Sequence, residues 1–365
     1  MSTNFVEVLC LDYVKPHPDA DRLDVAIIRG TTVVVPRGQF VKGQKVVYFP
    51  PDMLIPERVA EELGVANYLK HSIYPGDVVK SKCRIGAARL RGQASFGFCV
   101  DIDTVFFGSD ALLPENTDVS KYFQAFKYEP PVKVRQEDAA NEHPAFHKYT
   151  DIEHYWRYPV AIPEGAEVRI TEKIHGTNSR VGLVSMGNGE FEFMAGSHKV
   201  NRKRPEEGRP SIYWEPLTSE NMLRLLTGLC DQQHTVVVFG EIYGQGIQDM
   251  DYGVTPGQRG YRVFDITVEG AYMGWHDLVG ICTLYHVETV PLLYLGPFSE
   301  AVLSELTDGP TTLGDPKASF KGREGVVVTT TEEQFYAPTG GRRIVKSVSA
   351  DYMARKGALD EGELA

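Results

Sequence analysis

A lysine that ends an alternating segment constrains this chain more than any other feature. Residues 168–173 read Val-Arg-Ile-Thr-Glu-Lys, and apolar and polar side chains alternate in them as in a half-buried β-strand. Lys173 ends the segment, and Gly176 follows in a turn where a phosphate group can come close to the backbone. An amine held at a strand end can act as a covalent nucleophile toward a nucleotide phosphate. An isolated Lys-x-x-Gly is more often an ordinary exposed strand end, so the other motifs must decide.

Length, charge and cysteine content limit the number of domains and the classes of protein to which this chain can belong. The 365 residues suffice for two or three domains, and 42% hydrophobic residues supply an ordinary globular core. The net charge of -11 gives no global nucleic-acid signature, so any polyanion site must be a local basic patch. The five cysteines include no Cys-x-x-Cys pair, which indicates reduced thiols and no zinc knuckle. With no signal peptide and no apolar run of membrane-spanning length, we expect a cytoplasmic monomer that binds no membrane.

The first part of the chain is predicted to form a small β-barrel. Short β-branched runs at 5–9, 25–28, 31–35 and 45–49 are separated by turn residues, and a short helix is predicted for 56–63. The segment from His17 to Val25 resembles the opening of tRNA-binding-type OB modules, although a proline-rich turn explains it as well.

A basic cluster lies close in sequence to two aromatic residues, Phe96 and Phe98. Its members are Lys80, Lys82, Arg84, Arg89 and Arg91. Such a group suits a platform for single-stranded nucleic acid, and a solvated basic loop is the alternative.

The composition of residues 127–145, with paired prolines and mixed charge, is typical of a linker. We therefore expect one domain at 1–126, a second at 146–356 and a tail at 357–365. In the second domain, Asn188-Gly189 between alternating segments predicts a β-hairpin. Helices are predicted at 222–229, capped by Thr218 or Ser219, and at 301–306 and 349–356. Further strands are predicted at 236–243, 261–266, 324–328 and 344–346.

After Lys173, four residues follow in the order that nucleotidyl transfer through lysine requires. Glu241 and Glu324 belong to strand motifs, and their carboxylates can hold a divalent cation directly or through water. Lys346 can neutralise a phosphate as charge develops, and Phe264 offers a flat face to adenine. Taken singly, Glu241 would be a salt-bridge partner and Phe264 a core residue, so the joint order carries the argument.

These motifs together resemble those of the covalent nucleotidyltransferase superfamily, and within it the RNA ligases of the phage and trypanosome-editing type. Residues 172–178, Glu-Lys-Ile-His-Gly-Thr-Asn, look like the nucleophile motif of that family. Residues 239–252 are similar to its third motif and the loop after it, and residues 261–266 resemble its adenine-stacking strand. Glu324-Gly325 and residues 343–346 resemble its last two motifs, and residues 146–155 its domain start, so the resemblance covers 146–356.

The resemblance implies an α+β fold. A β-rich OB-like barrel would precede an ATP-grasp-like nucleotidyltransferase domain built on antiparallel sheets with flanking helices. It implies an ATP-dependent RNA ligase of RNA repair, in which Lys173 takes AMP from ATP and passes it to an RNA 5′-phosphate before a 3′-hydroxyl displaces the AMP. The implied cofactors are ATP and Mg²⁺ or Mn²⁺. The implied partner is RNA with 3′-hydroxyl and 5′-phosphate ends, including a nicked duplex.

The resemblance also assigns roles to individual residues. The catalytic set is Lys173, Glu241, Glu324 and Lys346, and the metal falls to Glu241 and Glu324. The nucleotide-binding set is Glu172, Lys173, Ile174, Gly176, Phe264, Glu324 and Lys346. The RNA-binding set is Asn178, Lys199 and Arg202, although a solvated loop remains the alternative for residues 199–209.

Two positions depart from the family pattern. His198 stands where the family usually has an arginine, which leaves Lys199 or Arg202 as a substitute, and Val348 stands where it has a second lysine. A DNA ligase or a GTP-using capping enzyme would share the chemistry, but those usually append an OB domain after the last motif. A non-catalytic RNA-binding protein that kept the fold is the third alternative, and the intact catalytic set argues against it.

Overall fold

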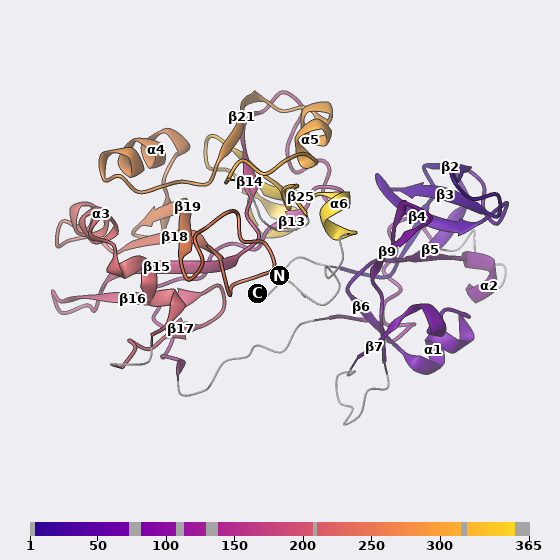
Figure 1. The fold of residues 1–365 in the computed structure, drawn as a ribbon, viewed down its shortest axis with the longest axis horizontal. Coiled ribbons are helices and arrows are strands. Elements are labelled where there is room, and N and C mark those ends of the chain that lie inside the picture. The colour runs from indigo at the N-terminus through magenta and orange to yellow at the C-terminus, as the bar shows by residue number, and fades with distance from the viewer. Residues whose placement is uncertain are drawn as a thin grey trace. The chain divides into compact units, whose positions relative to one another are not determined.

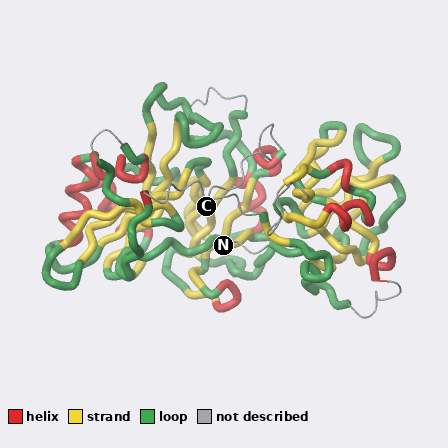
Figure 2. The backbone as a smooth tube through the Cα atoms, turned by 90° about the horizontal axis from the view of Figure 1, so that it is seen from below, coloured by secondary structure: helices red, strands yellow, loops and turns green. Residues whose placement is uncertain are grey.

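The computed structural model describes residues 4–72, 82–106, 113–128, 138–206, 210–314 and 320–354. The chain divides into two compact units, one built mainly from Ser2–Pro130 and the other mainly from Pro131–Tyr352 (Figure 1). Strands and loops dominate both units, and the helices are few and short (Figure 2).

The N-terminal unit consists of small antiparallel sheets. One three-stranded sheet has the order β1-β5-β11 and another is the meander β2-β3-β4, while a four-stranded sheet has the order β12-β6-β8-β7 and β9 pairs with β10. The strands are β1 (Glu7–Cys10), β2 (Tyr13–Pro16), β3 (Leu23–Ile28), β4 (Thr31–Pro36), β5 (Lys45–Phe49), β6 (Met53–Pro56), β7 (Lys70–Ser72), β8 (Lys82–Arg84), β9 (Ala87–Leu90), β10 (Gln93–Phe96), β11 (Phe98–Asp101) and β12 (Phe126–Lys127). Helices are α1 (Glu57–Glu62), η1 (Ala66–Tyr68) and α2 (Ile102–Phe106). The strands and the helix predicted in this part are therefore confirmed, with Pro56 just before α1 rather than inside it.

The predicted aromatic platform in this unit is wrong. Phe96 is buried, and Phe98 stacks on core residue Phe49 with 4.6 Å between ring centroids. Arg84 is also buried and forms an ion pair of 2.6 Å with Asp52. Phe96 packs in a small cluster with Ala87 and Ala94, and Phe98 packs against the larger core around Phe49, whereas Arg89 and Arg91 are exposed. Lys80 and the side chain of Lys82 lie outside the described residues.

The C-terminal unit is built on two larger sheets. The six-stranded sheet has the order β17-β16-β15-β18-β19-β20, and the five-stranded sheet has the order β13-β25-β22-β14-β21. Their strands are β13 (Glu153–His154), β14 (Glu167–Lys173), β15 (Thr177–Ser185), β16 (Phe191–Ser197), β17 (Asn201–Arg202), β18 (Val236–Gly244), β19 (Arg259–Val268), β20 (Ala271–Tyr272), β21 (Leu292–Pro297), β22 (Gly325–Thr330) and β25 (Ile344–Val348). Both sheets are antiparallel as expected, except that β13 pairs parallel with β25. The predicted hairpin is confirmed as β15 and β16.

Helices cover the outer faces of these two sheets. Leu225 of α3 (Glu220–Cys230) and Trp275 of α4 (Trp275–Leu284) pack in one cluster with Val238 of β18. Leu303 of α5 (Glu300–Thr307) packs with Val326 of β22 on the other sheet. The remaining elements are η3 (Ile212–Thr218), β23 (Phe335–Tyr336), η4 (Ala337–Thr339), β24 (Gly341–Arg342) and α6 (Ala350–Met353).

The inner faces of the two sheets meet each other. Phe239 and Val237 of the six-stranded sheet share a cluster with Ile344 and Val327 of the five-stranded sheet. Every second residue of β14, β22 and β25 therefore points toward the other sheet. This inner layer is where the sequence motifs converge.

All five cysteines are free thiols, as expected. Cys83 and Cys99 are buried in the N-terminal unit, and Cys230 and Cys282 in the C-terminal unit, while Cys10 is half-buried. Over the described ranges, the structure has no helix long and apolar enough to cross a membrane.

Candidate active site

Sheet register places the two predicted catalytic lysines on the same inner face. Lys173 on β14 lies opposite Gly325 on β22, and Lys346 on β25 lies opposite Val327, two residues along β22. Directly opposite residues in a sheet project to the same side, and so do residues two apart on one strand. Lys346 is buried at 6% exposure, so an anion that meets it must enter this inner layer.

Glu324 is the partner of the lysine at the strand end. The Lys173 ammonium donates to Glu324 Oε1 and forms an ion pair with it. The second oxygen, Oε2, is buried without a hydrogen-bond partner and lies 3.8 Å from Nδ1 of His175. Gly325, the next residue, has φ +154°, and a Cβ there would lie 2.2 Å from the carbonyl oxygen of Ser347. A glycine is thus required for β22 to approach β25 at the point where Glu324 enters the site.

His175 is fixed from three sides. Its backbone N–H donates to the Tyr252 hydroxyl at 2.6 Å, and its Nε2 lies 2.9 Å from a carboxylate oxygen of Asp249. The Tyr352 hydroxyl lies 2.8 Å from Nδ1 and donates to it when Nε2 carries the proton. Sequence reasoning assigned no part to Asp249 or Tyr352, because contacts across 74 and 177 positions leave no local pattern.

Glu241 lies beside Asn178 across the β15–β18 pair. Gly176 makes this approach possible, since a Cβ at that position would lie 2.2 Å from the Ile242 carbonyl oxygen and 2.9 Å from Cγ of Glu241. Oδ1 of Asn178 is buried without a hydrogen-bond partner. The structure thus brings Glu241 and Asn178 together at the end of β18 nearest the turn after Lys173.

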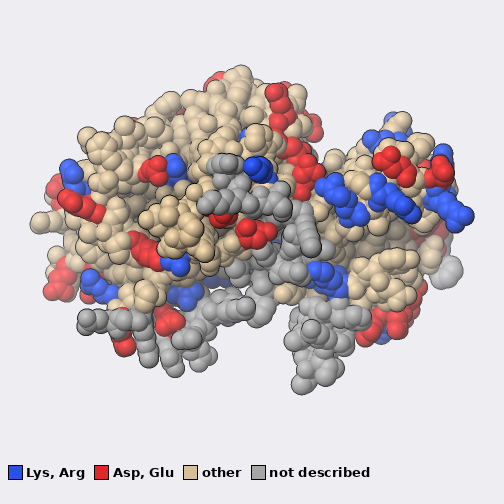
Figure 3. All heavy atoms as spheres, in the orientation of Figure 1, with Lys and Arg blue, Asp and Glu red and all other residues tan. Residues whose placement is uncertain are grey.

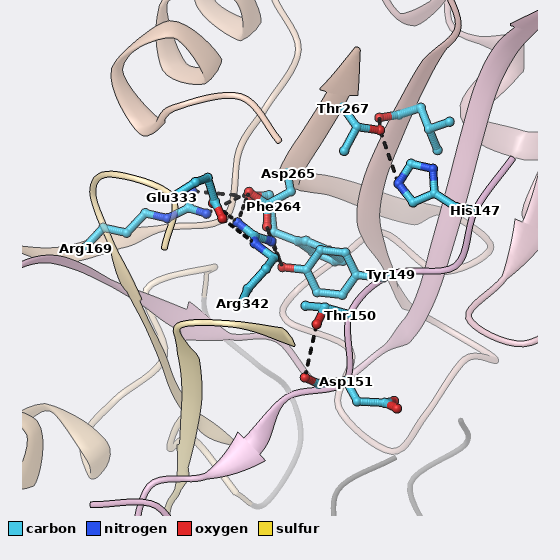
Figure 4. A network of polar contacts seen from close by, with 11 residues as sticks. His147, Tyr149, Thr150, Asp151, Arg169, Phe264, Asp265, Thr267, Glu333 and Arg342 are labelled. Atoms are coloured by element: carbon cyan, nitrogen blue, oxygen red, sulfur yellow. Dashed lines mark hydrogen bonds and ion pairs between the residues drawn. The ribbon is translucent and has the colours of Figure 1, made fainter. Parts of the chain in front are cut away.

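Phe264 is a half-buried residue of β19. Its ring meets the ring of Tyr149 edge-on, with 4.8 Å between centroids, and its carbonyl oxygen accepts from Arg169 at 3.3 Å (Figure 4). The ring also packs against the cluster that contains Ile174. This residue keeps a partly open ring close to the lysine motif.

Glu172 is placed differently from the other motif residues. Strand alternation directs its side chain to the opposite face from Lys173. Only 1% of Glu172 is exposed, and its carboxylate accepts from the hydroxyls of Thr311 and Thr312 and from the Thr312 backbone N–H at 2.8 Å. Its contact with adenine stays a prediction.

The substitute for the family arginine is not His198. Burial lowers the pKa of His198 to about 4, and nearby cations including Arg180 and Lys199 act in the same direction. The Asp151 carboxylate, 3.2 Å from Nε2, favours the charged form but does not outweigh them. At neutral pH the side chain is therefore uncharged, and a cationic substitute at Lys199 or Arg202 stays a prediction. The guanidinium of Arg202 stacks on the ring of Tyr213 at 4.7 Å.

No described group of three or more His, Cys, Asp or Glu side chains is arranged to hold a metal ion by itself. The inner layer nevertheless suits a divalent cation that is shared with a ligand. Mg²⁺ and Mn²⁺ sites of this kind use one or two carboxylates together with phosphate oxygens and water. Glu324 Oε2 and Asn178 Oδ1 are buried oxygens without hydrogen bonds, which fits positions that a ligand completes.

Known proteins share both halves of this architecture. The RNA ligase family model matches residues 166–348, half of the chain, and an OB-fold domain model matches residues 5–102. No curated protein matches the chain. Among solved structures, a Lys-to-Ala variant of Naegleria gruberi RNA ligase with ATP and Mn is similar at TM-score 0.72 and 21% identity, covering 96% of this chain and 98% of that one.

Two further structures of that enzyme are similar over the same extent. A Glu-to-Ala variant with AMP and Mn has TM-score 0.73 at 21% identity, and the enzyme with pyrophosphate has TM-score 0.71 at 20% identity. Each covers 96% of this chain and 98% of its own. These likenesses establish a shared fold of an OB-fold domain and an α+β ligase domain. With the family model matching half of its length, the chain belongs to the RNA ligase family.

Proposed function

We propose that this RNA ligase uses ATP and joins an RNA 3′-hydroxyl to a 5′-phosphate through a lysyl-AMP intermediate on Lys173. The ion pair between Lys173 and Glu324 carries the proposal, because it holds an amine at a strand end beside a buried carboxylate. The similar Naegleria gruberi structures contain ATP or AMP with Mn, which supports the same nucleotide here.

In the first step, the Lys173 ammonium releases a proton to water, and the free amine attacks the α-phosphorus of ATP. A nitrogen–phosphorus bond forms, the bond to the β-phosphate oxygen breaks, and pyrophosphate leaves. Lys346, on the same face, offsets the negative charge that develops on the phosphate. Glu241 and Glu324 would hold Mg²⁺ or Mn²⁺, which supplies charge neutralisation on the phosphates.

In the second step, the RNA 5′-phosphate attacks the lysyl-AMP phosphorus and releases the lysine amine. The RNA 3′-hydroxyl then attacks the adenylated 5′-phosphate, a phosphodiester forms and AMP leaves. We assign Asn178, Lys199 and Arg202 to the RNA, and the guanidinium of Arg202, held against the ring of Tyr213, supports this assignment as a cation for a backbone phosphate.

The proposal extends to the setting. Residues 1–126 would position RNA and residues 146–356 would perform the chemistry, in a cytoplasmic monomer that repairs RNA and accepts a nicked duplex. The division of the chain near Pro130 into two compact units supports separate tasks.

Transfer of label from α-³²P-ATP to the protein tests the central step. We expect label on the wild type with ATP and none with GTP, held by a nitrogen–phosphorus bond that acid hydrolyses and alkali does not, and no label on Lys173→Ala. Lys173→Arg is the matched control, because it keeps the charge beside Glu324 but lacks a nucleophilic amine at neutral pH. Label on either variant would disprove the assignment of Lys173, and label from GTP would favour a capping enzyme.

A further inference from the structure

A charged network lies between the two sheets, away from the lysine site. Asp265 of β19 is 1% exposed and accepts from Arg169 at 2.7 Å and from Arg342 at 2.8 Å. The Tyr149 hydroxyl also donates to Asp265, and Glu333 holds the far side of Arg342 with a contact of 2.8 Å to Nε (Figure 4). Two cations thus face two carboxylates, and the charges balance.

The network is fully bonded. None of the four described side chains Asp265, Arg169, Arg342 and Tyr149 has a buried nitrogen or oxygen that lacks a hydrogen bond. Burial alone would raise the pKa of the Asp265 carboxyl, but the charges and hydrogen bonds of Arg169 and Arg342 hold it below its usual value. Arg342 also stacks on Tyr272 at 3.6 Å, and Arg169 on Trp275 at 4.7 Å. Each guanidinium therefore has one fixed orientation.

Stability alone does not explain such a network. Removing two cations and two carboxylates from water is costly, and apolar side chains of similar volume often replace buried ion pairs without loss of stability. What fixed, directional contacts add is a single geometry. The role of this network therefore lies in the parts of the molecule that it holds in place.

The network ties the strand of the nucleophile to the strand of the stacking ring. Arg169 lies on β14 four residues before Lys173 and on the same inner face, roughly 13 Å away along the strand. Through Asp265 and the Phe264 carbonyl oxygen it bonds to β19 of the other sheet. Phe264 is thereby held by its own carbonyl, by its neighbour Asp265 and by the ring of Tyr149.

Glu241, the predicted metal-binding carboxylate on β18 of the six-stranded sheet, is also connected to this network. Asp265 lies directly opposite Phe239 on β18, and Glu241 follows two residues later on that strand. The charged network thus joins the sheets at one level, while Lys173 lies further along β14 and Glu241 further along β18, the strand paired with β19. A shift of the sheets at this level would displace both groups relative to each other, and a displacement of 1 Å in a reacting geometry can cost about 100-fold in rate.

We infer that Arg169, Asp265, Arg342 and Tyr149 are positioning residues that fix the two sheets against each other and so align the Lys173 amine with Phe264 and Glu241. The inference rests on the proposed function, because adenylation of Lys173 is the reaction that the alignment serves. Arg169 belongs to the strand of Lys173 and Asp265 to the strand of Phe264, so the network acts on the lysine through β14 and β19.

Two variants of the network test the inference in the full-length protein. Asp265→Asn keeps the side-chain shape and removes the charge, and Arg169→Lys keeps the charge and removes the planar fork that contacts both Asp265 and Phe264. We expect single-turnover formation of enzyme-AMP at saturating ATP to fall by about 100-fold in Asp265→Asn and about 10-fold in Arg169→Lys. Tyr149→Phe, which loses one hydrogen bond, should slow it by about threefold.

A stability control separates alignment from folding. Leu303→Ala removes a buried side chain on the outer face of the five-stranded sheet, outside the network. At a temperature where every variant is folded by circular dichroism, this control should adenylate within about threefold of wild type even when its melting temperature is as low as that of Asp265→Asn. If Asp265→Asn does not fold, the comparison of Arg169→Lys with Leu303→Ala still tests the inference.

The outcomes are distinct. Wild-type rates in folded Asp265→Asn or Arg169→Lys would overturn the inference, and so would equal slowing in Leu303→Ala at a matched melting temperature. Absence of label on the wild type would overturn the proposed function and the inference with it. Slowing confined to the network variants would support both.

Discussion

At the scale of single residues, two glycines set the geometry of the site as much as the charged groups do. Gly176 lets β15 pass beside Glu241, and Gly325 lets β22 approach β25 beside Glu324. In both cases a Cβ would meet a backbone carbonyl oxygen at 2.2 Å, which a side-chain rotation cannot relieve. The sequence resemblance predicted Gly176 as a nucleotide-binding position, and the structure adds a steric requirement within the protein itself.

Gly176→Ala should therefore damage both stability and adenylation. We expect a loss of about 1–3 kcal/mol or more in the free energy of unfolding, because overpacking forces the backbone to shift. Gly280→Ala is the matched control, since Gly280 lies in α4 with no atom near its absent Cβ. It should be stabilised by up to about 1 kcal/mol, as expected for Gly-to-Ala in a helix. Urea unfolding measures the stability of each variant, and label transfer measures its adenylation. A Gly176→Ala variant that is active and as stable as wild type would show that the strands can separate without harm.

Glu241→Gln and Glu324→Gln should each reduce adenylation by about 100-fold or more, because an amide binds a divalent cation far more weakly than a carboxylate. Adenylation measured across a range of Mn²⁺ concentrations gives the half-saturating value, which should rise in both variants. Undiminished adenylation in a folded variant would reject the metal role of that residue. Glu288→Gln, which alters an exposed ion-pair partner of Arg262, should behave as wild type.

His198 should make the protein less stable in mild acid. Its pKa is about 4 in the folded chain, below its ordinary value of 6.5, so the unfolded chain binds the proton more readily between these values. The free energy of unfolding therefore falls as the pH is lowered from 6.5 to 4 and is unaffected by this group above that window. In His198→Gln the fall across the window should be smaller. Thermal unfolding at pH 4.5 and 7.5 compares the two proteins, and parallel pH profiles would contradict the assignment.

At the scale of elements, the sequence predicted those strands and helices that a local pattern of residues marks. Alternation, apolar runs and glycine breaks identified β14, β18, β22 and the hairpin of β15 and β16. The parallel pairing of β13 with β25, and the contacts of Glu172 with Thr311 and Thr312, join segments far apart in the chain, and no local pattern encodes them. The supposed aromatic platform failed for a related reason, because no local pattern showed that Phe96 is buried at the end of β10 or that Phe98 stacks on Phe49.

The start of α3 is one element boundary that can be tested directly. The sequence left Thr218 and Ser219 as alternatives, and the structure assigns the cap to Ser219, whose side chain accepts from the Met222 N–H. Ser219→Ala should cost about 1 kcal/mol in the free energy of unfolding. The hydroxyl of Thr218 instead bonds to the Glu215 carbonyl, so Thr218→Ala should cost less. Equal losses in urea unfolding would argue against this cap.

At the scale of the whole molecule, the chemistry motifs and the OB-fold domain occupy separate units. The motifs from Lys173 to Lys346 all belong to the C-terminal unit, and exposed arginines such as Arg89 and Arg91 belong to the N-terminal one. On the face drawn in Figure 3, basic side chains gather on the N-terminal unit with acidic ones among them. This distribution agrees with the expectation that a chain of net charge -11 offers only local basic patches to a polyanion.

A fragment that begins at Glu142 should therefore form enzyme-AMP from ATP but seal RNA poorly. Phosphate contacts supply affinity and register, so the fragment should also show a weaker dependence of RNA binding on salt than the full chain. Sealing assays on nicked duplex and single-stranded RNA at two salt concentrations compare the two. Full sealing with unchanged salt dependence would refute an RNA role for residues 1–126, and loss of adenylation would show that they help to form the ATP site.

The distribution of thiols gives each unit its own chemical reporter of opening. Burial raises the pKa of Cys99 in one unit and of Cys282 in the other to about 12, so neither is a thiolate near pH 8 in the folded chain. An alkylating reagent reaches such a group only when the surrounding structure opens, and the extent of modification at each peptide then follows the opening of one unit alone. Mass spectrometry of a single labelled sample can thus rank the stabilities of the two halves, with no added dye and no substitution.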